Sequence, residues 1–127
     1  MDLSSLNQSL NVITNKITTY LDNKPKIDFA DFEHQQDVIY ISNKYNEIVT
    51  AYSYLLDLIT EIHYFISQCK KVNRLISGNT SLETSQKAKI KTAISLVEEQ
   101  AEPLNYERDR LKTIEMFYRN LYTRKDF

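Results

Sequence analysis

Glycine and proline are almost missing from this chain, which has one glycine and two prolines in 127 residues. Average usage is about 7% glycine and 5% proline. Folds rich in strands and loops need many turns, so this scarcity favours a few long helices. It also removes the glycine-rich loops that cradle phosphates, which argues against a nucleotide-hydrolysing fold.

The sequence has a single cysteine, and it shows neither a signal-peptide pattern nor a membrane-spanning apolar run. Cys69 is the single cysteine, which excludes an intrachain disulfide and fits a reducing compartment. The first residues, Met1 to Ser5, lack the basic and apolar regions of a signal peptide. No apolar run approaches the ~20 residues that a bilayer span requires. We therefore expect a soluble, cytoplasmic protein without a membrane partner.

Catalytic and metal-binding patterns are also missing from the sequence. The two histidines, His34 and His63, lie on one expected helix and would be roughly 43 Å apart at the helical rise. No Glu-x-x-His spacing of the kind used by di-iron bundles occurs around His63. We expect no enzymatic activity, no catalytic residues, no metal site and no cofactor.

Apolar residues at alternating steps of three and four dominate residues 30–76 and predict one long helix. Asp28 or Asp31 is expected to cap its start. A second apolar column, which includes Leu58 and Phe65, widens the stripe, so the helix should have neighbours on two sides, in a bundle or an oligomer. The expected core and oligomerisation seam comprises Ile48, Tyr52, Leu55, Ile59, Ile62 and Ile66.

Two further helices are expected on either side of this one. Residues 3–21 form a short amphipathic helix that ends before Pro25, and residues 81–122 form a second long helix. Residues 77–80 form the turn between the long helices, with Gly78 in the left-handed conformation and Thr80 and Glu83 as a capping box. The predicted fold is a single all-α domain over residues 1–127, a coiled-coil-like antiparallel helical hairpin plus the N-terminal helix, assembled into a homo-oligomer.

Two irregularities mark the last helix. Pro103 cannot donate a backbone hydrogen bond and should kink it. Arg108 falls at a position where the apolar register requires a hydrophobic residue, and the register then slips.

Charge is strongly segregated although the net charge is only −1. Residues 1–63 carry four lysines against nine acids (−5), residues 64–97 carry six basic residues against one acid (+5), and residues 98–127 carry six against seven (−1). In a hairpin the positive stretch lies at one end, where it would attract a polyanion; the alternative is an ordinary solvated helix surface. Tyr64 and Asn73 lie nearby and could stack on or hydrogen-bond to bases. The candidate nucleic-acid contacts are Lys70, Lys71, Arg74, Lys87, Lys89 and Lys91.

The run Lys70 to Gly78, followed by Lys89 to Thr92 and by Tyr106 and Arg124 eighteen residues apart, resembles the UvsY-type recombination mediator proteins of T4-like phages. The resemblance implies a non-enzymatic homo-oligomer in the host cytoplasm. It would bind single-stranded DNA and load a recombinase onto strands coated by single-strand-binding protein. Lys70 matches the lysine that contacts DNA in the family.

The chain also departs from the family pattern. Val72 stands where the family has an arginine, so Lys71 or Arg74 would have to replace that contact. The sequence ends soon after Arg124, where better-known members continue with a segment used in assembly, so the subunit number does not carry over.

Two other functions fit the same residues. The chain could be a coiled-coil structural or adaptor protein, such as a virion or complex-assembly component, with no nucleic-acid role. An inhibitor that blocks a nucleic-acid enzyme has only the −5 charge of residues 1–63 in its favour.

Overall fold

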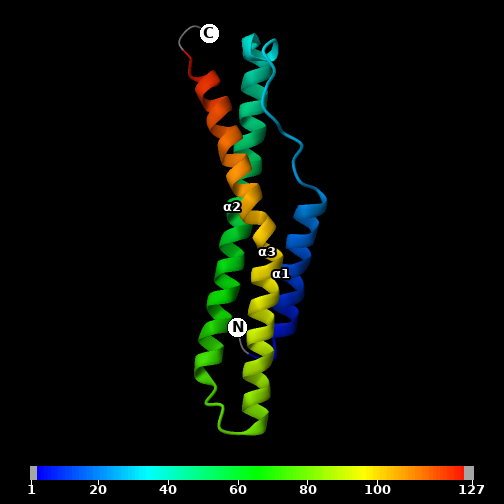
Figure 1. Cartoon of the computed structure of the whole chain (residues 1–127), viewed down its shortest axis with the longest axis vertical. Coiled ribbons are helices and arrows are strands. Elements are labelled where there is room, and N and C mark those ends of the chain that lie inside the picture. Colours follow the sequence, from blue (N-terminus) through cyan, green and yellow to red (C-terminus); the bar gives the residue numbers. More distant parts are fainter. Residues whose placement is uncertain (1–2, 125–127) are drawn as a thin grey trace. The chain divides into compact units, whose positions relative to one another are not determined.

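The protein is built from three α-helices and one short 3-10 helix, as a computed structural model shows for residues 3–124 (Figure 1). The elements are α1 (Leu6–Asp22), η1 (His34–Gln36), α2 (Val38–Leu75) and α3 (Ser81–Tyr122). No strand occurs within the described range. The prediction of an all-helical protein is therefore confirmed.

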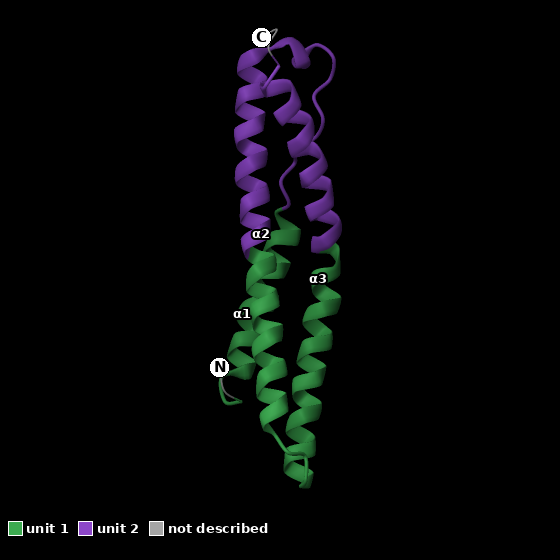
Figure 2. Ribbon diagram, turned by 90° about the vertical axis from the view of Figure 1, so that its left-hand side faces the viewer, with its two compact units in different colours: residues 1–23, 58–103 green, residues 24–57, 104–127 purple. Residues whose placement is uncertain are grey.

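The chain divides into two compact units (Figure 2). Unit 1 consists of Met1–Asn23 and Leu58–Pro103, and unit 2 of Lys24–Asp57 and Leu104–Phe127. Helices α2 and α3 are each divided between the two units, whereas α1 belongs to unit 1 alone. The expected single domain over the whole chain stays a prediction, and each unit has a core of its own.

The core of unit 1 lies where α1 packs beside the second part of α2 and the first part of α3 (Figure 2). Two of the predicted seam residues, Ile59 and Ile62, are buried there, and Ile66 is half-buried. Burial also raises the pKa of the Cys69 thiol. The other buried side chains are Leu6, Ile13, Ile17, Tyr20, Leu58, Phe65, Ile90, Ala93 and Val97.

The core of unit 2 combines the first part of α2, the last part of α3 and the segment before α2. Ile48 and Leu55 of the predicted seam are buried in it, and Tyr52 is half-buried. Two ring pairs flank this core, Phe29 edge-on to Phe117 and Tyr45 stacked on Tyr122. The remaining buried side chains are Ile27, Ala30, Ile41, Leu104, Leu111, Ile114, Tyr118 and Leu121.

Helix α2 begins at Val38 rather than at about residue 30. The cap is Asp37, whose Oδ1 accepts the backbone N–H of Tyr40 at 3.1 Å. Asp31, one of the expected caps, instead accepts the backbone N–H of His34 at 2.9 Å and starts η1. This bond is the main cause that lowers the pKa of Asp31. Several aspartates in one segment can cap a helix, so the sequence alone did not select the right one.

Residues 24–30 form no helix, and side chains of α3 satisfy some of their carbonyl groups. Arg110 donates from Nη1 to the carbonyl of Ile27 (2.9 Å) and from Nη2 to that of Pro25 (3.1 Å). The hydroxyl of Tyr118 donates to the carbonyl of Asp28 at 2.5 Å. Burial is the largest of the causes that raise the pKa of Tyr118 to about 12. The hydroxyl therefore keeps its proton at neutral pH and remains a hydrogen-bond donor. Buried backbone groups need partners, and these bonds supply them without a helix.

The apolar register of α3 is continuous, which corrects the predicted slip. Buried residues recur at steps of three and four through Leu104, Glu107, Leu111 and Ile114. Glu107, not Arg108, occupies the core-facing position, and Arg108 is half-buried beside it. Because the core-facing position is occupied by a carboxylate, the sequence alone did not reveal that the register of α3 is continuous. Pro103 lies within α3, and the kink expected there stays a prediction.

Glu107 is buried because Arg110 neutralises it. The two side chains form a pair with Arg110 Nε 2.5 Å from Glu107 Oε1 and Nη2 3.3 Å from Oε2. Only 6% of the Glu107 side chain is exposed. A buried charge must be paired to be tolerated, and Arg110 provides the pairing while it also holds the segment before α2.

We expect Arg110→Ala to lower the free energy of unfolding by about 2–3 kcal/mol, since it leaves the Glu107 carboxylate buried without its cation. Urea denaturation followed by circular dichroism measures the loss. The matched control is Arg108→Ala, which removes a surface pair with Asp109 (3.4 Å) and should cost less than about 1 kcal/mol. Equal losses in the two variants would contradict this account of Glu107.

Candidate nucleic-acid interface

The six predicted phosphate contacts all lie in unit 1, on either side of the turn between α2 and α3. Lys70, Lys71 and Arg74 occupy the last two turns of α2, and the other three occupy the early turns of α3. Five of the six side chains are exposed, whereas Lys87 is half-buried. The exposed set is Lys70, Lys71, Arg74, Lys89 and Lys91.

The turn itself has the local structure that its sequence predicts. Gly78 adopts a φ of +76°, a conformation that side chains other than glycine rarely take. The hydroxyl of Thr80 accepts the backbone N–H of Glu83 at 3.1 Å and caps α3. The Ser77 hydroxyl donates to the Glu83 carboxylate, and this bond, followed by those from Thr80, lowers the pKa of Glu83.

Lys87 has a structural task in this turn. Its ammonium donates to the carbonyl of Asn73 at 2.7 Å and to that of Ile76 at 2.8 Å. Carbonyls at the end of a helix have no partner within the helix, so a lysine that reaches back from α3 satisfies the end of α2. A Cβ at Gly78 would lie 3.3 Å from Lys87 Cδ, so the glycine also leaves room for this side chain. Sequence reasoning assigned Lys87 to phosphate binding and did not foresee these two bonds.

The five exposed cations have no acidic partner in the described part of the chain. None of the salt bridges found in residues 3–124 involves Lys70, Lys71, Arg74, Lys89 or Lys91. Glu83 is the sole acid between residues 64 and 97, and it is engaged by Ser77 and Thr80. No described salt bridge therefore neutralises these five cations, which leaves them able to attract an anionic ligand.

A shallow groove of about 360 Å³ lies along the exposed side of α2 at this end. Lys70 and Arg74 line it together with His63, Ile66 and Ser67. Sequence reasoning missed His63 and Ser67 as neighbours of the two cations. His63, Ser67, Lys70 and Arg74 follow one another at steps of four, three and four residues. This spacing was the signal that could have placed them on one helix face.

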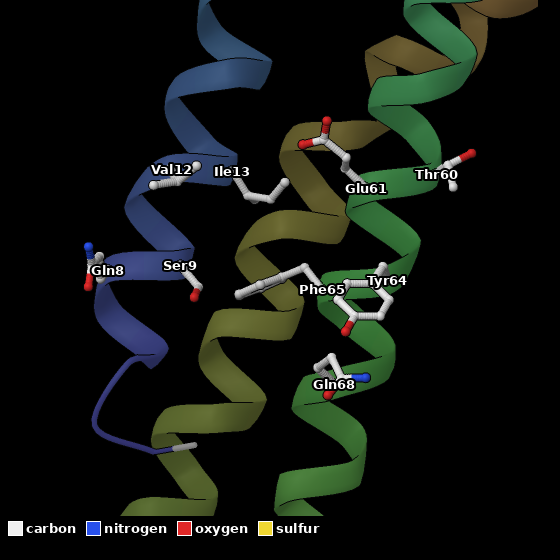
Figure 3. A pocket seen from close by; sticks show the side chains of 9 residues that line it. All are labelled: Gln8, Ser9, Val12, Ile13, Thr60, Glu61, Tyr64, Phe65 and Gln68. Carbon is white, nitrogen blue, oxygen red and sulfur yellow. The ribbon is translucent and has the colours of Figure 1, made fainter. Parts of the chain in front are cut away.

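A larger groove of about 660 Å³ lies between α1 and α2 of unit 1 (Figure 3). Ile13 points from α1 toward α2 and Phe65 points from α2 toward α1, and both side chains are buried. Tyr64, by contrast, is 67% exposed at the groove. The complete lining is Gln8, Ser9, Val12, Ile13, Thr60, Glu61, Tyr64, Phe65 and Gln68.

No protein-family model, curated protein or solved structure matches this chain. Within residues 3–124, no helix is long and apolar enough to cross a membrane. The same residues contain no group of three or more histidine, cysteine or acidic side chains that could hold a metal ion.

We expect Lys87→Met to lower the free energy of unfolding by about 1–3 kcal/mol, because two carbonyls at the end of α2 lose a charged donor. Thermal and urea denaturation measure the change. Lys89→Met is the matched control, since it removes the same charge two residues away from an exposed side chain and should stay within about 0.5 kcal/mol of the wild type. If both variants are as stable as the wild type, Lys87 does not cap α2.

Proposed function

We propose that this protein is a non-enzymatic, single-stranded DNA-binding mediator that helps to load a recombinase onto strands coated by single-strand-binding protein. The supporting observation is the set of five exposed cations around the α2–α3 turn, none of which has an acidic partner in the described part of the chain. Each phosphate neutralised by such a cation releases condensed counterions, which drives binding.

The resemblance to UvsY-type mediators supports the same function. Lys70, which matches the DNA-contacting lysine of that family, is exposed. Val72, at the position of the family's arginine, is half-buried, while Lys71 and Arg74 on either side of it are exposed. These two residues are therefore suited to replace the missing contact. Lys89 and Lys91 add charge from α3.

The proposal includes an antiparallel pairing of α2 and α3 and the assembly of several copies. The hydrogen bonds from Lys87 to the end of α2 support a tight return of the chain. Four of the six predicted seam residues, Ile48, Leu55, Ile59 and Ile62, are buried in the cores of the two units, so copies would meet mainly through other side chains. In unit 2, the partly exposed Val49, Leu56 and Met116 line a groove of about 380 Å³ that suits such a contact.

DNA binding is tested by fluorescence anisotropy with a labelled oligothymidylate over a series of salt concentrations. With five phosphate contacts, the logarithm of the association constant should fall with the logarithm of salt concentration with a slope of roughly −3.5. The double variant Lys70→Ala, Lys71→Ala should remove most of the binding at physiological salt and reduce the magnitude of the slope by about 1.4.

The control for charge alone is the double variant Lys24→Ala, Lys26→Ala, which removes two exposed lysines of unit 2. This variant should bind DNA like the wild type. Absence of binding at low salt, or an equal loss in this control, would rule out the α2–α3 turn as a DNA site.

The second candidate function is a coiled-coil adaptor or structural protein, favoured by the partly exposed Val49, Leu56 and Met116 in unit 2. Light scattering separates the two functions. A mediator that assembles alone should give a closed oligomer of defined mass, and Met116→Glu should reduce that mass. A monomer or dimer that aggregates, and that does not bind DNA, would favour the adaptor.

A further inference from the structure

Tyr64 is a large aromatic side chain left in solvent next to the basic end of α2. It is 67% exposed, although neighbouring Phe65 is buried. Tyr64, Gln68 and Lys71 follow one another at steps of four and three residues, so they lie in one column on α2. Such a column places an aromatic ring, an amide and an ammonium on the same side of the helix within two turns.

The groove beside Tyr64 has the composition of a site for a flat, mainly apolar ring. Ile13 and Phe65 supply buried apolar surface, and Val12 of α1 adds a partly exposed wall. Gln8 of α1 and Gln68 of α2 are among the lining residues, so each helix contributes one amide group to the groove. A nucleobase has an apolar face for stacking and a polar edge for amide groups, so this lining can receive it.

Charge favours a nucleic acid over an apolar protein segment as the occupant. Glu61, the acid that lines the groove, is neutralised by Lys16 of α1, whose Nζ lies 2.6 Å from its Oε2. Lys71, in the column of Tyr64, has no salt-bridge partner in the described chain. A strand whose base enters the groove would therefore find a free cation for its phosphate.

We propose that the α1–α2 groove binds an unstacked nucleobase against Tyr64 while Lys71 holds a phosphate of the same strand. This inference rests on the proposed DNA binding and adds to it the element that distinguishes single strands from duplexes. Bases in a duplex are stacked on one another and do not offer a free face. Phosphate contacts alone do not make this distinction, because both forms of DNA present phosphates.

The test compares Tyr64→Ala with the wild type in the full chain by anisotropy. We expect the affinity for an oligothymidylate to fall about 5- to 150-fold, which corresponds to the roughly 1–3 kcal/mol lost when a base-stacking aromatic ring is removed. The salt dependence should not change, because stacking releases no counterions. Tyr64→Phe should bind within about twofold of the wild type, since the ring is kept. Affinity for a duplex of equal length should not change.

An oligonucleotide of abasic sites gives the direct control, because it keeps the phosphates and lacks the bases. The wild type and Tyr64→Ala should bind this oligonucleotide equally, which attributes the difference on oligothymidylate to the base. Tyr106→Ala is the matched tyrosine control. It removes a similarly exposed ring (71%) from a tyrosine of unit 2 that does not line the groove, and should leave binding unchanged.

The outcomes separate this inference from the proposed function. If the Lys70→Ala, Lys71→Ala variant loses binding but Tyr64→Ala binds like the wild type, the groove is not a base site and the DNA-binding function stands. If Tyr64→Ala weakens binding to duplex or abasic DNA as much as to oligothymidylate, stacking is also ruled out. Failure of the wild type to bind any DNA overturns both proposals.

Discussion

The alternation of three- and four-residue steps between apolar side chains is the constraint on which the structure depends. A helix with such a stripe is stable in water only when the stripe is covered. In unit 1 the stripe of α2 is covered together with those of α1 and α3, and in unit 2 with α3 and the segment before α2. Most charged side chains are consequently left on the outer faces, and the buried Glu107 is the exception among the described residues.

Positive side chains occur in two distinct settings in this molecule. Arg110 and Lys87 point their donors at backbone carbonyls and stabilise chain segments that lack helical hydrogen bonds. Lys70, Lys71 and Lys89 are exposed and free of salt bridges within the described residues. Net charge alone does not distinguish these settings, because the distinction depends on which carbonyls a side chain can reach.

The sequence predicted the parts of the fold that depend on local pattern. The helical class and the turn around Gly78 follow from spacing and from backbone chemistry that acts over a few residues. Hydrogen bonds between residues far apart in the chain were not predictable. Arg110 lies 83 residues from Ile27, and no local signal connects them. Glu107 was missed because a buried carboxylate is recognised only when its partner is known.

The unbroken register of α3 restricts how this protein can change during evolution. An α-helix turns by about 100° per residue, so the loss or gain of one residue would rotate every later side chain away from its core. Seven residues make almost two whole turns and restore the phase. Related chains should therefore differ in the lengths of α2 and α3 by multiples of seven, with both helices altered together. Single insertions should be confined to the residues between the helices.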